Sequence, residues 1–146
     1  PVERDRLISS IEKLIGSGDG KTVFIIEDDD ELRFLLREAL SKEAYDVMEA
    51  ENGKVALQEL GAAVGSPDLI LLDLNMPVMN GFEFLEIYRE KFGNDVPIVV
   101  VTGADLTEKD KKFLSGEVAR ILEKTPDTEG TIAGDVAKVL RNVRMG

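Results

Sequence analysis

The sequence contains no cysteine and no histidine. Without cysteine there are no disulfide bonds and no thiolate metal sites, which fits a cytoplasmic protein. Without histidine the chain cannot use Ser-His-Asp or Cys-His catalysis, bind zinc through imidazole, or carry a phosphohistidine itself. No apolar run approaches the roughly 18–20 residues that a membrane span needs, so we expect no membrane insertion. Any chemistry must therefore rest on other side chains.

Positive charge is also scarce, because 18 Lys and Arg residues face 29 Asp and Glu residues and the net charge is −11. Nucleic acid repels such a surface, so we expect no direct binding to DNA or RNA. A hydrophobic content of 43% in 146 residues allows one domain with an ordinary core. The excess of acids can serve solubility or hold a cation, and only their positions distinguish these two roles.

The first 16 residues predict an amphipathic helix, because their apolar residues recur at helical spacing. These residues are Leu7, Ile8, Ile11, Leu14 and Ile15. The segment GSGDGK that follows predicts a flexible linker. We therefore divide the chain into a leading helix with its linker, residues 1–20, and a main domain, residues 21–146.

In the main domain, apolar runs alternate with helical patterns. The predicted strands are 22–26, 45–49, 68–72, 97–101 and 118–122. The predicted helices are 30–43, 52–64, 80–92, 107–114 and 131–143. This alternation predicts an α/β fold in which helices cover both faces of a parallel sheet. The commonest arrangement is the flavodoxin-like (βα)5 doubly wound sheet with strand order 2-1-3-4-5, here with an extra N-terminal helix.

Acidic residues follow two strands that are neighbours in this order. Strand 1 runs into Glu27-Asp28-Asp29, and strand 3, within LILLDLNMPVMNG, runs into Asp73. Adjacent strands lie about 4.8 Å apart, and two like charges about 4 Å apart repel by about 4 kcal/mol at a dielectric near 20. Either a raised pKa or a shared cation must offset this repulsion. An oxygen-rich site that is open to water suits Mg²⁺.

Helix capping is the competing explanation for some of these acids, and Asp29 or Asp30 could be the N-cap of the first main-domain helix. Asp73 cannot cap the next helix, because a proline and several further residues intervene. Thr102 ends the fourth strand and Lys124 follows the fifth. A hydroxyl and an ammonium group at this edge could bind an anion whose charge the metal alone does not neutralise.

Over about residues 21–143 the chain resembles the receiver domain of two-component response regulators. The motifs are IIEDDDELR, PDLILLDLNMPVMNGFEFL, PIVVVTGAD and LEK. The resemblance implies that Asp73 accepts a phosphoryl group from a phosphohistidine on a histidine kinase or histidine phosphotransfer protein. It implies a signalling domain that assists its own phosphorylation and dephosphorylation rather than an enzyme.

The resemblance also assigns the metal site. Glu27, Asp28, Asp73 and the backbone carbonyl of Asn75 would bind Mg²⁺, with Mn²⁺ as a possible substitute. The assignment follows the family motif residue by residue, and none of the chain's departures from the family pattern removes a member of the phosphorylation site.

Further residues would bind the phosphoryl group and transmit the signal. Thr102 would bond one phosphoryl oxygen and Lys124 would pair with another. Their movement would alter the face made by the fourth and fifth strands. Gly81 would relieve the turn into the third main-domain helix by adopting a positive φ.

Two departures from the family pattern concern the fifth strand. The family usually has Lys-Pro after this strand, whereas Thr125 here separates Lys124 from Pro126. Ile121 stands where the family often has a rotating Tyr or Phe. These changes put in doubt the loop geometry and the output through this face. A separate alternative is a pseudo-receiver that is not phosphorylated and acts as a protein docking module, although the intact set of acids argues against it.

The leading helix has three interpretations: a cloning remnant, a signalling or dimerising helix, or the last helix of a preceding receiver. We favour the third, because P-V-x-x-x-x-L-x-x-x-I-x-x-L resembles the segment after the family's Lys-Pro. The parent protein would then be a tandem-receiver or hybrid kinase protein. The apolar stripe must pack on the main domain or on a second copy in a homodimer.

Other activities fit the acidic edge poorly. A flavodoxin needs a phosphate-binding loop after strand 1, where acids would repel phosphate. A haloacid-dehalogenase-type phosphatase needs D-x-D at the first strand, and EDDD has the wrong spacing. An EF-hand fails because Gly81 is at loop position 9 rather than 6, and because Phe84 occupies the position where the loop needs its glutamate.

Overall fold

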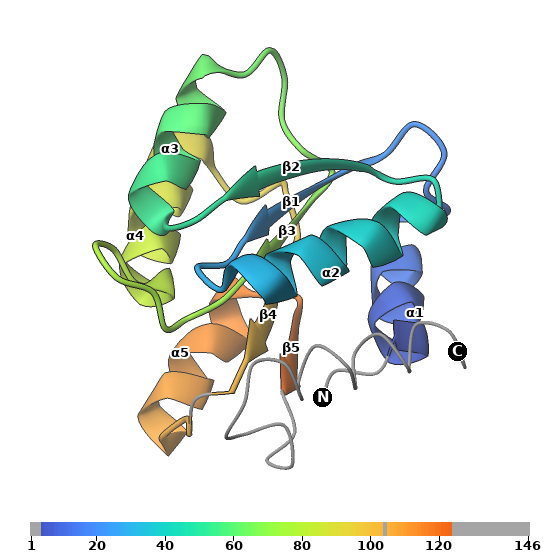
Figure 1. The fold of residues 1–146 in the computed structure, drawn as a ribbon. Helices are drawn as coiled ribbons and strands as arrows, with labels where there is room; N and C mark the ends of the chain where they lie inside the picture. The colour runs from blue at the N-terminus through green and yellow to red at the C-terminus, as the bar shows by residue number, and fades with distance from the viewer. Residues whose placement is uncertain (1–3, 104, 124–146) are drawn as a thin grey trace.

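The computed structural model describes residues 4–103 and 105–123 (Figure 1). Its strands are β1 (Thr22–Ile26), β2 (Asp46–Ala50), β3 (Leu69–Leu72), β4 (Ile98–Thr102) and β5 (Arg120–Glu123). They form one parallel sheet in the order β2-β1-β3-β4-β5. The predicted flavodoxin-like fold class is therefore confirmed.

The helices within these described residues are α1 (Arg4–Ile15), α2 (Asp30–Lys42), α3 (Gly53–Ala62), α4 (Gly81–Phe92) and α5 (Glu108–Glu117). The predicted leading helix is confirmed as α1. The predicted helix at 131–143 lies outside the described residues. None of the helices that the structure describes is long and apolar enough to cross a bilayer.

Alternate strand residues point to opposite faces of the sheet and build two separate cores. Val23 and Ile25 of β1 belong to the cluster that includes α1 and α2 side chains. Phe24 and Ile26 belong to the cluster that includes side chains of α3, α4 and α5. Figure 1 shows α1 and α2 together on the near side of the sheet. Burial on both faces explains why β1, β3 and β4 are continuous apolar runs.

The leading helix is part of the first core. Leu7, Ile8 and Ile11 of α1 are buried in the same cluster as Val99 of β4 and Leu122 of β5. Three of the five residues of the predicted apolar stripe are therefore buried in the core of their own chain, whereas Leu14 is 39% exposed. The homodimer and the origin of the helix in a preceding receiver remain predictions.

A buried tyrosine ties the segment after α1 to the turn before β2. The Tyr45 hydroxyl donates a 2.8 Å hydrogen bond to the Gly16 carbonyl. Burial raises the pKa of Tyr45, and the nearby carboxylates of Glu12 and Glu43 raise it further. The phenol therefore stays protonated, and able to donate, throughout the neutral range.

Most element ends lie within one or two residues of the predicted ones, and the differences have local causes. β2 begins at Asp46 rather than Tyr45, because the Tyr45 amide still donates to the Leu40 carbonyl at the end of α2 (3.1 Å). β5 begins at Arg120 rather than Val118, because the Val118 amide closes the last turn of α5 on Leu114 (2.9 Å).

Candidate functional site

The register of β1 and β3 places the first acidic residue after each strand at the same level. Ile26 pairs with Leu72, so Glu27 and Asp73 follow at matching positions. The Asp73 amide donates to the Ile26 carbonyl (3.0 Å), and the Glu27 amide donates to the Ala50 carbonyl (3.1 Å). Backbone hydrogen bonds from the sheet thus hold both residues rigidly at its carboxyl edge.

Three carboxylates meet there, as the sequence predicts. Glu27, Asp28 and Asp73 each offer one oxygen, and these oxygens all lie within 4.8 Å of one another. Glu27 and Asp73 are 2% and 5% exposed, whereas Asp28 faces solvent. Oxygens bound to one Mg²⁺ lie roughly 3–4 Å apart, given bonds of 2.0–2.1 Å. The observed set therefore fits a small hard cation after minor side-chain rotation, with one side open to water.

Asp29 is the N-cap of α2 and is separate from this cluster. Its side chain accepts hydrogen bonds from the amides of Glu31 (3.0 Å) and Leu32 (3.2 Å). Its own amide donates to the Glu27 carboxylate (3.2 Å). The capping explanation is therefore confirmed for Asp29.

Arg33 is a contact residue of this edge that the sequence analysis missed. Its Nη1 donates a 2.7 Å hydrogen bond to the Glu27 carbonyl, and its Nη2 lies 2.6 Å from Asp30 Oδ1. The spacing of Asp30 and Arg33 on α2 could have predicted that ion pair. No local pattern predicts the bond to the carbonyl at the end of β1.

Thr102 ends β4, the strand beside β3, and is 1% exposed. The register places Leu72 opposite Val100, so Thr102 lies two positions further toward the carboxyl edge. On its other side it pairs with Glu123 of β5. The structure thus brings Thr102 to the predicted edge. Lys124 lies outside the described residues, as do Thr125 and Pro126.

The loop from Asp73 to α4 corrects the expectation for Gly81. Gly81 is not among the residues with positive φ. A Cβ atom at this position would lie 2.6 Å from the Asp73 carbonyl oxygen and 2.8 Å from Leu74 Cα, so glycine is needed for close backbone approach. The Gly81 amide donates to the Leu74 carbonyl (3.0 Å), which folds the loop back on the end of β3.

Positive φ occurs in the same loop at Val78 instead, with φ 69°. The Met79 amide donates to the Pro77 carbonyl (2.7 Å) across this residue, which makes a γ-turn. A β-branched residue is strained there. Asn75, the predicted carbonyl ligand, is exposed in this loop, and its metal contact remains a prediction.

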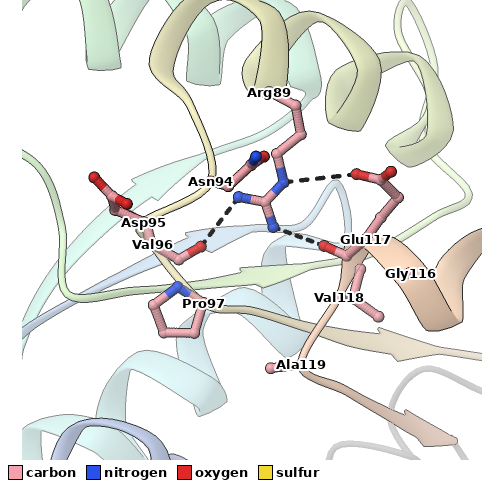
Figure 2. A pocket seen from close by; sticks show the side chains of 9 residues that line it. All are labelled: Arg89, Asn94, Asp95, Val96, Pro97, Gly116, Glu117, Val118 and Ala119. Carbon is pink, nitrogen blue, oxygen red and sulfur yellow. Dashed lines mark hydrogen bonds and ion pairs between the residues drawn. The ribbon is translucent and has the colours of Figure 1, made fainter.

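A pocket of about 430 Å³ lies at the opposite edge of the sheet, and Arg89 is one of the residues that line it (Figure 2). The Arg89 side chain donates to the carbonyls of Val96 (3.3 Å) and Glu117 (2.6 Å) and pairs with the Glu117 carboxylate (3.8 Å). The pocket lies before β4 and β5, whereas the acidic cluster lies after β1 and β3. It is therefore no part of the acidic site.

Ile121 of β5 is half-buried and packs against the core on the α3–α5 face. The aliphatic side chain at this position therefore contributes to the core. The effect of this departure on output remains a prediction.

Known proteins match both the sequence and the fold. Residues 23–133 match the response regulator receiver domain family. The chain is 34% identical over 102 residues to the phosphate regulon transcriptional regulatory protein PhoB of Pseudomonas aeruginosa, covering 68% of this chain and 42% of PhoB. It is 38% identical over 94 residues to histidine kinase P4 of Formosa agariphila, covering 64% of this chain and 7% of the kinase.

Solved structures of response regulators share the architecture. The phosphorylated cyanobacterial phytochrome response regulator RcpA is 27% identical, with a TM-score of 0.66 over 86% of this chain and 89% of that one. Response regulator TrrA of Thermotoga maritima, in complex with Mg²⁺-BeF, is 24% identical, with a TM-score of 0.61 over 84% and 98%.

The family match extends across most of the chain, including both acidic strand ends and the close-packed glycine turn that follows Asp73. The chain spans less than half the length of the curated relatives it matches, so the match concerns one domain of those proteins. This chain belongs to the response regulator receiver domain family, the signalling domain of two-component systems.

Proposed function

We propose that this domain takes a phosphoryl group onto Asp73 from a phosphohistidine of a partner protein, with Mg²⁺ bound by Glu27, Asp28 and Asp73. One observation carries the proposal: three carboxylates whose oxygens lie within 4.8 Å of one another at the end of two adjacent strands. Such a cluster is costly without a cation. Glu27 and Asp73 are nearly inaccessible to water and therefore poorly screened.

The proposed reaction transfers one group between two side chains. A carboxylate oxygen of Asp73 forms a bond to phosphorus as the bond between phosphorus and the donor imidazole nitrogen breaks. That nitrogen keeps the bonding pair and takes up a proton. The protein contributes position and charge neutralisation, which are the main requirements of phosphoryl transfer.

In the proposed site Asp73 accepts the phosphoryl group, and the other acidic residues help to bind the metal. The Asp73 amide donates a hydrogen bond to the Ile26 carbonyl, so the carboxylate projects from a fixed backbone. Glu27, Asp28 and, in the proposed site, the Asn75 carbonyl complete an oxygen ligand set for Mg²⁺, or for Mn²⁺ in its place. The bound cation supplies charge neutralisation between the carboxylates and the incoming phosphoryl oxygens.

Thr102 and Lys124 complete the proposed phosphoryl site from β4 and from the residue after β5. Thr102 would bond one phosphoryl oxygen, and Lys124 would pair with another. Phosphorylation adds roughly 1.5–2 negative charges by analogy with other phospho-residues. Movement of Thr102 and Lys124 toward this charge would alter the β4–β5 face and carry the signal to an output partner.

The partner proposed is a histidine kinase or histidine phosphotransfer protein in the cytoplasm. A relative named as a histidine kinase supports this, as does a solved relative described as phosphorylated. A solved neighbour in complex with Mg²⁺-BeF supports the metal. The domain also assists the loss of its own phosphoryl group. The positive charges that stabilise the phosphoryl oxygens during transfer would stabilise them equally when water attacks phosphorus.

The alternative is a docking module that is never phosphorylated. Its support is the aliphatic Ile121, which packs into the core where the family often has a mobile aromatic. In that case the carboxylate cluster would remain but would not take up a phosphoryl group.

Phosphate-affinity electrophoresis after incubation with acetyl phosphate and Mg²⁺ tests the proposal. The wild type should give a shifted band that requires Mg²⁺, and Asp73→Asn should give none. Asp95→Asn, which neutralises an exposed carboxylate at the opposite edge, is the matched control and should shift like the wild type. A shift that survives Asp73→Asn would move the acceptor elsewhere, and no shift in the wild type would favour the docking module.

A further inference from the structure

Arg33 connects three elements at the acidic edge. Its Nη1 donates to the Glu27 carbonyl at 2.7 Å, its Nη2 contacts Asp30 Oδ1 at 2.6 Å, and its Nε lies 3.3 Å from Glu49 Oε1 of β2. The side chain is only 18% exposed. Each nitrogen of the guanidinium plane thus has its own acceptor, which fixes the side chain in one arrangement.

The carbonyl that Arg33 binds is the last one before Asp28. The backbone of this turn is held from both sides, because the Glu27 amide donates to Ala50 of β2 while the Glu27 carbonyl accepts from Arg33. The Arg33 amide also donates to the Asp29 carbonyl at 2.9 Å. That backbone bond is the ordinary first bond of α2, which any residue at position 33 would make. The contact that depends on the Arg33 side chain is therefore the one to the Glu27 carbonyl, in the peptide group that leads into Asp28, the exposed member of the carboxylate cluster.

We infer that Arg33 is a positioning residue that holds the Glu27–Asp28 turn so that its carboxylates face Asp73, and that it thereby sets the affinity of the domain for Mg²⁺. This inference rests on the proposed function, since it concerns the same metal site. Arg33 itself touches neither the proposed metal nor the phosphoryl group. It acts through the backbone of residues that do.

The charge of Arg33 acts in the opposite direction, because a cation near the site repels Mg²⁺. Two contacts reduce this repulsion. Asp30 and Glu49 both pair with the guanidinium, so the group and its partners together present little positive charge to the site. We therefore expect geometry to outweigh charge: removing this cation should weaken the binding of another cation.

Calorimetric titration of the full chain with Mg²⁺, without phosphodonor, separates these effects. Arg33→Met removes the charge and all donors. Arg33→Lys keeps the charge but has one nitrogen instead of three. Both should weaken Mg²⁺ binding by about tenfold, the lower range seen when a group that holds a metal ligand is lost.

Arg37→Met is the matched control. Arg37 lies one turn further along α2 and contacts the same Glu49 at 2.8 Å, with its side chain 39% exposed. Its loss removes a charge of the same sign close by and should leave the Mg²⁺ affinity within about twofold of wild type, as expected for a screened surface pair.

Circular dichroism melts of every variant fix a temperature at which all are folded, so that stability does not enter the comparison. If Arg33→Met does not fold, Arg33→Lys decides alone. Wild-type affinity in Arg33→Lys, or tighter binding in Arg33→Met, would overturn the positioning role and leave the proposed function intact. Failure of the wild type to bind Mg²⁺ would overturn both.

Discussion

The two edges of the sheet, one at the amino ends and one at the carboxyl ends of its parallel strands, differ in how their charged groups are paired. At the edge before β4, the Arg89 guanidinium closes onto the carbonyls of Gly93, Val96 and Glu117 and onto the Glu117 carboxylate. At the edge after β1 and β3, three carboxylates are brought within 4.8 Å of one another. At the first edge a positive charge is surrounded by hydrogen-bond acceptors and a carboxylate. At the second edge three negative charges lie close together.

Backbone conformation differs less between the two edges. At the Arg89 edge Gly93 has a φ of 89°, where a glycine carries little strain, and Ala44 has a φ of 68° in the turn before β2. At the acidic edge Val78 has a φ of 69°, where a β-branched residue is more strained than alanine or glycine. Both edges therefore hold a non-glycine residue with positive φ, and the β-branched one lies in the loop where the chemistry is proposed to occur.

The largest expected effect comes from the core between the two edges. Ile11 of α1 is 0% exposed, so Ile11→Ala should lower the free energy of unfolding by about 3 kcal/mol through lost burial and a cavity. Urea unfolding followed by circular dichroism measures this. Mg²⁺ affinity of the folded fraction should not change, and a parallel loss of affinity would show that the edges depend on overall stability.

Asp28→Asn should weaken Mg²⁺ binding on the order of a hundredfold, about 2.7 kcal/mol, because it removes one of three clustered charges. Calorimetric titration measures the dissociation constant. Asp95→Asn at the other edge, also an exposed carboxylate, is the control. Equal losses in the two variants would mean that general surface charge, rather than the cluster, attracts the ion.

Arg89→Met should lower the free energy of unfolding by about 2 kcal/mol, because it leaves three carbonyl groups without their charged donor. The side chain is 15% exposed, so water replaces these bonds only in part. Chemical unfolding gives the value. Because the site lies at the other edge, Mg²⁺-dependent phosphorylation should be unchanged, and its loss would contradict the separation of the two edges.

Val78→Gly has the smallest expected effect and the opposite sign. Relief of the strained γ-turn should outweigh the greater freedom of glycine in the unfolded chain and raise the free energy of unfolding by about 0.5–1 kcal/mol. Thermal unfolding measures the change. A destabilised variant would mean that the valine side chain, 73% exposed, contributes contacts that offset its strain.

Much of this contrast could be predicted from the sequence, for identifiable reasons. Strand order follows from alternating apolar runs and helices, and parallel order places Glu27, Asp28 and Asp73 at one edge whatever the side-chain details. Asp29 was correctly expected as a capping candidate because its position before a helical pattern is a local signal.

Other features depend on tertiary contacts that no local pattern encodes. The prediction that Gly81 is needed for a positive φ was wrong. Glycine is needed because backbone atoms of Asp73 and Leu74 lie where a Cβ atom would have to fit. The sequence pattern predicts Arg33 and Arg89 as ordinary surface residues of helices. In the structure, each side chain donates to a carbonyl outside its own helix. The burial of α1 residues in one cluster with residues of β4 and β5 depends on contacts between segments far apart in the sequence.

The most direct measurement is a titration of the ¹⁵N-labelled chain with Mn²⁺, followed by nuclear magnetic resonance. The paramagnetic ion broadens amide signals close to its site. We predict broadening around Glu27, Asp28 and Asp73 at low Mn²⁺, with the signals of Gly93 and Val96 unaffected. Broadening at the Arg89 edge, or none that favours the acidic edge, would contradict the claim that the ends of β1 and β3 share a divalent cation.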